Sequence, residues 1–143
     1  MTAEEMWLRL GLQGNYQAWA FGGAPNKLAK LVLQGVKTAT CSALALYEYE
    51  NEAIPQVGDY SVILDSDEQA VCIIRTTRVY ITTFDQVSER HAFLEGEGDR
   101  SLEYWRRVHE EFFTEELGTI QQEFDSRMKL ICEEFEVVEE DRK

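Results

Sequence analysis

The sequence has few of the residues that define several classes of protein. Its 143 residues include two prolines, and no linker, repeat or low-complexity stretch interrupts it. The three cysteines, Cys41, Cys72 and Cys132, lie far apart and form no CxxC motif. We therefore expect free buried thiols rather than disulfides. The two histidines, His91 and His109, are too few at ligand spacing for a zinc site, so no metal and no cofactor are expected.

Long apolar runs and targeting signals are also lacking. No run could span a bilayer, and the first residues show neither a basic nor an apolar region of a signal peptide. A hydrophobic content of 44% is nevertheless that of a globular protein. The length fits one domain over residues 1–143. We expect a soluble, cytoplasmic protein without a membrane partner, of unknown oligomeric state.

Positive charge is scarce. The sequence has 14 Lys and Arg but 27 Asp and Glu, which gives a formal net charge of −13. Nucleic-acid binding usually depends on cations that neutralise phosphates, and an acidic surface repels a polyanion at long range. The charge therefore favours a small, neutral or weakly charged ligand. The acidic C-terminal segment is interpreted as a solvated face.

Helix signals occur at three places. Thr2 and Glu5 have capping-box spacing, which predicts a short helix in an N-terminal extension over residues 1–24. Pro25 and Gly35 bracket a second helix that opens the core, residues 25–138. Ser101 can cap a third helix. Its apolar stripe, which we interpret as core, consists of Leu102, Trp105, Val108 and Phe112.

Strand signals surround these helices. Residues after Lys37 alternate polar and apolar, residues 60–64 and 70–81 form a hairpin pattern, and residues 128–138 end the core as a strand. A short helical region is predicted over residues 84–93. Four or five strands without a βαβ rhythm predict an α+β fold with a strongly curved, largely antiparallel sheet or small barrel.

The segment Gly35-Val36-Lys37-Thr38-Ala39-Thr40 offers an amine and a hydroxyl three residues apart. On a strand they would point to opposite faces, whereas a bend after Gly35 would bring them together. A lysine beside a hydroxyl can assist nucleophilic attack or hold an oxyanion. From spacing alone, a surface lysine and an ordinary strand threonine are the favoured interpretation.

The segment Glu95-Gly96-Glu97-Gly98-Asp99 places three carboxylates on alternate positions. Its glycines indicate a sharp, non-helical backbone. Crowded carboxylates raise one another's pKa, which can create a general base, and they could also chelate a hard cation. Asp99 could equally serve the start of the following helix. On that helix Arg106 and His109 share a face by their spacing.

Together these motifs resemble the ASCH domain family. The resemblance rests on Gly35-x-Lys37-x-x-Thr40, on His91-Ala92 followed by Glu95-Gly96-Glu97-Gly98-Asp99, and on Trp105-Arg106-x-x-His109. It implies a PUA-like small curved β-barrel with flanking helices. Some bacterial members of the family are amidohydrolases that act on acetylated cytidine through a Lys, a Thr and a Glu. The resemblance then assigns catalytic roles to Lys37, Thr40 and Glu95.

We expect the substrate-binding residues to be Ser42, Glu97, Asp99, Trp105, Arg106 and His109. The first hypothesis is an amide hydrolase for a modified nucleoside, with Thr40 as nucleophile and Glu95 as general base. The alternative is a non-catalytic module that binds single-stranded RNA through Lys37 and arginines 75, 106 and 107, with Tyr47 or Trp105 stacking on bases. A third hypothesis is a metal-dependent ribonuclease built on Glu95, Glu97 and Asp99.

Overall fold

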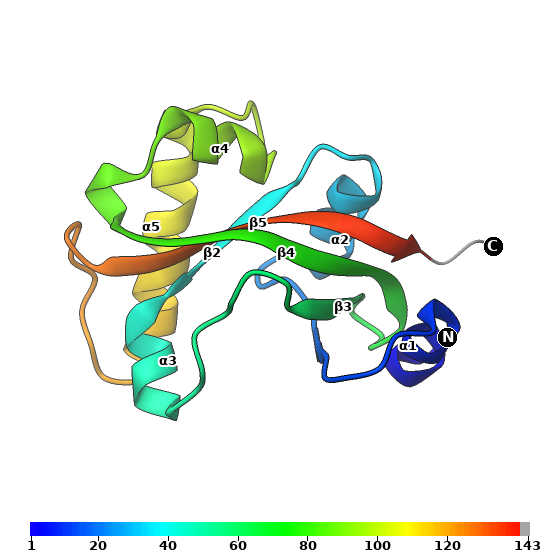
Figure 1. Ribbon diagram of the computed structural model, residues 1–143. Coiled ribbons are helices and arrows are strands. Elements are labelled where there is room, and N and C mark those ends of the chain that lie inside the picture. Colours follow the sequence, from blue (N-terminus) through cyan, green and yellow to red (C-terminus); the bar gives the residue numbers. More distant parts are fainter. Residues whose placement is uncertain (141–143) are drawn as a thin grey trace.

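A curled five-stranded sheet forms the centre of the computed structural model, which describes residues 1–140 (Figure 1). The strand order is β1-β3-β4-β5-β2, with β1 parallel to β3 and the other pairs antiparallel. The strands are β1 (Gln17–Trp19), β2 (Ala39–Ala43), β3 (Tyr60–Leu64), β4 (Ala70–Thr83) and β5 (Lys129–Glu140). The expected α+β fold with a curved sheet is confirmed.

The long strands β4 and β5 run side by side through the middle of the molecule (Figure 1). Two register shifts interrupt their pairing, between Ile73 and Ile74 and between Thr76 and Arg78. Such irregularities increase strand twist and bend a sheet. They contribute to the curl that brings the two edge strands, β1 and β2, to either side of one groove.

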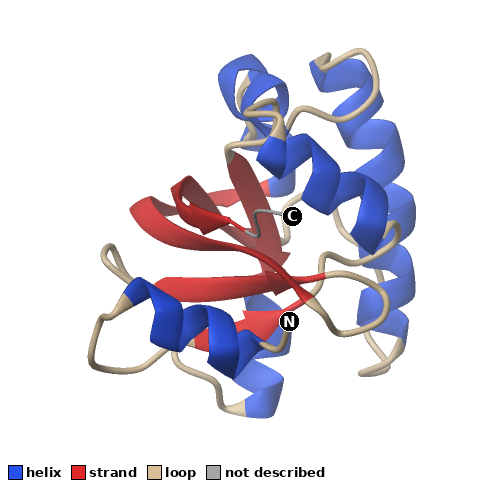
Figure 2. Ribbon diagram, turned by 90° about the vertical axis from the view of Figure 1, so that its right-hand side faces the viewer, coloured by secondary structure: helices blue, strands red, loops and turns tan. Residues whose placement is uncertain are grey.

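The helices pack around this sheet (Figure 2). Their bounds are α1 (Ala3–Leu10), α2 (Pro25–Leu33), α3 (Leu44–Glu50), the 3-10 helix η1 (Phe84–Gln86), α4 (Glu89–Glu95) and α5 (Leu102–Gly118). Thr2 and Glu5 form the expected capping box of α1. Pro25 starts α2 as predicted, and Ser101 caps α5 by accepting from the Tyr104 backbone N–H.

Residues 1–24, expected as an extension, contribute both α1 and β1. Met6 and Trp7 of α1 are buried against Val62 and Ile73 of the sheet. β1 pairs with β3 as an edge strand. The strand was not predicted from the sequence, because only three residues of strand lie among the neighbouring glycines.

The buried stripe of α5 differs from the predicted one. Trp105, His109, Phe113 and Leu117 recur at every fourth position and are buried. Val108 and Phe112, predicted as core, are only half-buried. The predicted stripe left out the polar residue His109. It therefore included Val108 and Phe112, each of which lies one position before a buried residue.

All three cysteines are free thiols, as expected, with Cys72 and Cys132 buried and Cys41 half-buried. Within residues 1–140, no helix has the length and apolarity needed to cross a membrane.

Candidate functional site

The turn after α2 places Lys37. Gly35 adopts a left-handed backbone with φ of 76°, and the N–H groups of Val36 and Lys37 both donate to the Leu31 carbonyl. Lys37 therefore lies before the first residue of β2, so strand alternation does not separate it from Thr40. The bend anticipated after Gly35 is present. It directs Lys37 inward, where only 2% of the residue is exposed.

The end of α4 brings Glu95 to Lys37. Glu95 is the last residue of α4, and Gly96 caps it with φ of 78°. A Cβ on Gly96 would lie 2.6 Å from the Val36 carbonyl oxygen, so this close approach requires glycine. The Thr38 N–H also donates to the Leu94 carbonyl at 2.8 Å. The first glycine of the Glu95–Asp99 segment thus joins the two motifs.

The Glu95 carboxylate is the centre of a buried polar network. Its Oε1 lies 3.2 Å from Lys37 Nζ and 3.6 Å from His109 Nε2. Its Oε2 accepts from His91 Nε2 at 2.7 Å and from Trp105 Nε1 at 2.8 Å. Four groups from three segments, the turn after α2, α4 and α5, therefore converge on one carboxylate.

This environment keeps Glu95 ionised. Burial alone would raise the pKa of its carboxyl, but the Lys37 charge and the contacts of His109 and His91 hold that pKa well below its usual range. An ionised, fully hydrogen-bonded carboxylate is a strong electrostatic anchor. It is also a weak proton acceptor, because these partners stabilise its ionised form.

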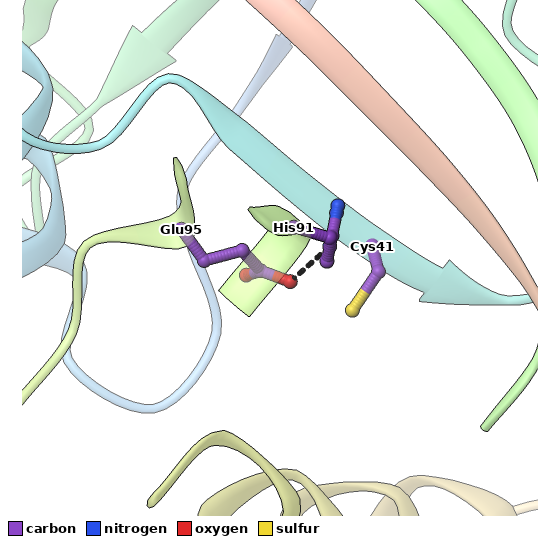
Figure 3. Close-up of side chains that lie close together, drawn as sticks. All are labelled: Cys41, His91 and Glu95. Atoms are coloured by element: carbon purple, nitrogen blue, oxygen red, sulfur yellow. Dashed lines mark hydrogen bonds and ion pairs between the residues drawn. The ribbon is translucent and has the colours of Figure 1, made fainter. Parts of the chain in front are cut away.

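His91 is held from both sides, and Figure 3 shows its ring beside Glu95 and Cys41. A carboxylate can only accept, so His91 Nε2 carries a proton. The other nitrogen, Nδ1, lies 3.3 Å from the Tyr80 hydroxyl, within hydrogen-bonding distance. The imidazole is therefore a positioning group for the Glu95 carboxylate, entirely shielded from solvent.

His109 lies on the other side of the carboxylate. Its ring stacks on Trp105 with centroids 4.2 Å apart, and its Nδ1 donates to the Trp105 carbonyl at 2.8 Å. Burial opposes its charging, but the contact with Glu95 and the charges of Glu95 and Glu97 outweigh this and raise the pKa of the imidazole. Lys37 balances the charge of one of the two carboxylates, Glu95 and Glu97, and protonated His109 would balance the charge of the other.

A cavity of about 250 Å³ opens onto this network. We call it the inner cavity. Its polar lining includes Lys37, Thr40, Glu95, Glu97 and His109. Glu97 is less buried than Glu95, with 19% of its side chain exposed, and its Oε2 lies 3.5 Å from Lys37 Nζ. The structure thus gathers an ammonium, a hydroxyl, two carboxylates and an imidazole at one place.

A second hollow of about 920 Å³ continues from the first. We call it the outer groove, and both β1 and β2 line it. The two spaces share Phe21, Gly22, Thr40, Cys41 and Phe112. Ser42 lines the outer groove only. Thr40 therefore lies at the junction, where a ligand in the groove could reach the Lys37 side.

A family model for the ASCH domain matches residues 17–139 of this chain. This chain belongs to the ASCH domain family. No curated protein matches it.

Two solved structures resemble this ASCH domain over nearly its whole length. Protein EF3133 from Enterococcus faecalis V583 is 40% identical, with a TM-score of 0.89 over 96% of this chain and 88% of that one. The ASCH domain from Lactobacillus crispatus JV V101 is 32% identical, with a TM-score of 0.88 over 95% and 93%. Hypothetical protein PH0355, at 16% identity and a TM-score of 0.56 over 85% and 100%, shares the fold alone.

Not every expected site residue reaches the ASCH cavities. Trp105 lines neither space but donates to Glu95. Asp99 is exposed and accepts from the Ser101 N–H, as the start of α5 requires. Arg106 is exposed on the outer side of α5, where it donates to the Asp85 carbonyl. The i, i+3 spacing of Arg106 and His109 does not place both in the site, because His109 lies at the buried edge of that face.

Sequence analysis gave His91 a smaller part than it has. It was considered only as a zinc ligand and as part of the family motif, yet it contacts Glu95 directly. The i, i+4 spacing of His91 and Glu95 in the same helix is a signal that could have identified this pair. The Tyr80 contact had no such signal, because it depends on how β4 packs against α4.

Two groups of side chains in residues 1–140 have metal-ligand proximity, namely Cys41 with His91 and Glu95, and Glu95 with Glu97 and His109. In the second, Lys37 Nζ already lies between the two carboxylates as their cation. In the first, burial and the Glu95 charge raise the pKa of the Cys41 thiol well above its usual range. That shift disfavours the thiolate needed for a metal ligand or a nucleophile.

Proposed function

We propose that this ASCH domain hydrolyses an amide bond in a small, acylated heteroaromatic amine, of which acetylcytidine is the representative. One observation carries the proposal: Lys37, Thr40, Glu95 and Glu97 line the same inner cavity, with the lysine amine held between the two carboxylates. An ammonium directed at a cavity that also holds a hydroxyl nucleophile is the arrangement acyl transfer needs.

In this proposal Thr40 Oγ1 attacks the amide carbonyl carbon and its proton passes to Glu97. Lys37 Nζ donates to the developing oxyanion. The C–N bond then breaks, and the amine leaves with the proton from Glu97. Water attacks the acyl-threonine ester and gives a proton to Glu97. Cleavage of the ester C–O bond returns that proton to Thr40 and releases the carboxylic acid.

We assign proton transfer to Glu97 rather than to Glu95, which the family resemblance suggested. Glu95 is buried, has both oxygens occupied and has a lowered pKa. Glu97 keeps part of its carboxylate exposed in the cavity. Glu95 then serves to hold Lys37 in place. This separates a catalytic carboxylate from a positioning one.

The test is hydrolysis of acetylcytidine by the wild type and by Thr40→Ala, Glu97→Gln and Thr38→Ala. Thr38 is two residues from Thr40, lines neither cavity and serves as the matched control. We expect a loss of at least about 10²-fold in kcat for the first two variants and little change for the control. Mass spectrometry should find the acyl group on Thr40 whenever deacylation is slowed.

No turnover by the wild type would end the proposal for this substrate. Full activity of Thr40→Ala would remove Thr40 as nucleophile even if turnover occurs. Full activity of Glu97→Gln, with loss in Glu95→Gln, would return the proton transfer to Glu95.

The other hypotheses receive less support from the geometry. Arg75, which was expected to meet RNA phosphates, pairs with Glu136 at 2.9 Å, and Arg106 points away from both cavities. The ribonuclease hypothesis needs Asp99 beside Glu95, but Asp99 lies at the start of α5. Neither alternative therefore has an assembled site in residues 1–140.

A further inference from the structure

The outer groove has an unusual charge composition. No Lys or Arg lines it, although its lining is extensive. Five carboxylates do, namely those of Glu50, Glu52, Asp59, Glu116 and Glu133. The two lysines near the site, Lys27 and Lys37, both line the inner cavity instead. The two connected spaces therefore differ in electrostatic character, and an anionic group placed in the outer groove would meet only negative charge.

Two of these carboxylates lie in the half-buried part of the groove. Glu133 accepts from the Thr76 hydroxyl at 3.2 Å, and in residues 1–140 neither Glu133 nor Glu116 forms an ion pair with a Lys or Arg. Burial raises the pKa of both carboxyls. A half-buried carboxylate without a counterion is costly, and a cationic ligand would relieve that cost.

Aromatic rings complete the lining. They belong to Tyr16, Trp19, Phe21, Tyr47, Tyr60 and Phe112. Trp19 and Phe21 pack edge to face with centroids 4.9 Å apart. Ring faces attract cations and stack on flat ligands. Carboxylates and rings together, without a basic residue, form a site for an aromatic cation and not for a phosphate.

The groove is also placed to serve the reaction. Glu133 pairs with Thr40 across β2 and β5, so the negative charge is adjacent to the proposed nucleophile. A substrate whose acyl group enters the inner cavity past Thr40 would leave its amine portion in the outer groove.

We propose that the outer groove binds an aromatic cation, so that the preferred amide substrate carries an aromatic ring with a positively charged group on its amine side and no phosphate. The link to a substrate rests on the proposed hydrolase function, whereas the binding itself does not. A phosphorylated form of the same compound should be rejected.

Three para-substituted acetanilides test this inference on the Thr40→Ala variant, in which no turnover is expected. They are para-acetamidophenyltrimethylammonium, para-tert-butylacetanilide and para-acetamidobenzoate, which are cationic, neutral and anionic. Calorimetric titration should show the cation binding about tenfold more tightly than its neutral isostere, with no detectable binding of the anion. Equal affinity of the cation and the neutral compound, or no binding of the cation at millimolar concentration, would overturn the inference.

A matched pair of double variants locates the effect. Glu116→Gln with Glu133→Gln removes two charges from the groove, and Glu115→Gln with Glu136→Gln removes two from the same helix and strand outside it. Both change the net charge equally, so the long-range field is the same. The cation's advantage should disappear only in the first pair. An advantage that persists there places the cation elsewhere and refutes the groove as its site.

The outcome separates this inference from the proposed function. If the cation shows its expected advantage but the wild type hydrolyses none of the acetamides, the groove is as inferred and the hydrolase proposal loses support. If acetylcytidine is hydrolysed but the cation has no advantage, the hydrolase stands and the inference falls. The comparison of the cation with its neutral isostere in the Thr40→Ala protein needs no substitution of a groove carboxylate, so misfolding of the double variants cannot protect the inference.

Discussion

Lys37 Nζ lies 3.2 Å from Glu95 Oε1, and both side chains are at most 2% exposed. A buried ion pair is costly to break from one side, because the remaining charge has no solvent to replace its partner. Here the pair also joins the turn after α2 to the end of α4. It therefore serves as a structural link as well as the centre of the proposed site.

The first prediction concerns this pair. Lys37→Met should lower the free energy of unfolding by about 3–5 kcal/mol, and Glu95→Gln should do the same, because each leaves a buried charge without its closest charged partner. The double variant should lose less stability than the sum of the losses in the two single variants. Urea denaturation of the four proteins measures the cycle. Strict additivity would mean that the two groups do not interact, contrary to the geometry.

The second prediction is a pH dependence. The pKa of Glu95 is well below 4.5 in the folded state, so unfolding increases proton binding at low pH. The stability contributed by its ionised form is complete above about pH 5 and is lost as the pH falls toward the folded-state pKa. Glu95→Gln cannot titrate. The stability difference between wild type and this variant should therefore narrow between about pH 5 and pH 3.

Denaturant unfolding at several pH values measures that difference. The other acids with a lowered pKa are present in both proteins and cancel in it, namely Glu5, Asp99, Asp125 and Glu134. A gap that stays constant across the acid range would show that the Glu95 carboxyl titrates equally in the folded and unfolded chains.

The fold was predictable where local patterns and packing agree. The helix between Pro25 and Gly35 and the β3–β4 hairpin follow from their punctuating residues and their alternation. α3 was not predicted, for an identifiable reason. Its N-cap Ala43 forms no side-chain cap hydrogen bond, and none of its residues is buried. Such a helix has neither a start signal nor a fully buried stripe, although Ala45 and Leu46 pack against the core from its first turn.

The site was predictable in part. Lys37 and Glu95 belonged to recognisable motifs, but their partners did not. The Trp105 indole meets Glu95 only because α5 packs beside α4, and Trp105 fits a core stripe equally well. Sequence patterns report which face of an element is buried, and not which polar atom in that face finds a partner on another element.

The third prediction uses this indole. Trp105→Phe keeps an aromatic ring between Phe84 and His109 but removes the N–H that donates to Glu95 Oε2 at 2.8 Å. The loss of one hydrogen bond to a buried charge should cost about 1.5–3 kcal/mol, in addition to the smaller ring. Phe84→Leu serves as a packing control, because it alters the same cluster without touching the carboxylate. The pKa of Glu95 should rise in Trp105→Phe alone, as followed by carboxyl NMR.

The fourth prediction concerns Gly96. In Gly96→Ala the new Cβ would lie 2.6 Å from the Val36 carbonyl oxygen, at a backbone φ of 78° that disfavours alanine. We expect destabilisation of at least about 1 kcal/mol and a larger loss of activity, because Glu95 and Lys37 would be separated. Gly118→Ala is the matched control, since nothing lies within 4 Å of its Cβ and its φ is not positive. Equal stability of the two variants would contradict the close approach.

The fifth prediction separates Cys41 from Thr40, its neighbour at the junction of the two cavities. Burial and the Glu95 charge raise the pKa of the Cys41 thiol, so it should react slowly with a thiol reagent near pH 8 in the native protein and rapidly once unfolded in urea. Cys41→Ser keeps a hydrogen-bond donor beside Glu95 and should retain most activity, whereas Thr40→Ala should abolish it. Loss of activity in Cys41→Ser, together with rapid native labelling of Cys41, would instead identify the thiol as the attacking group. The position of Cys41 matters as much as its acidity, because a thiol that faces an ionised carboxylate gains no stabilisation of its thiolate from it.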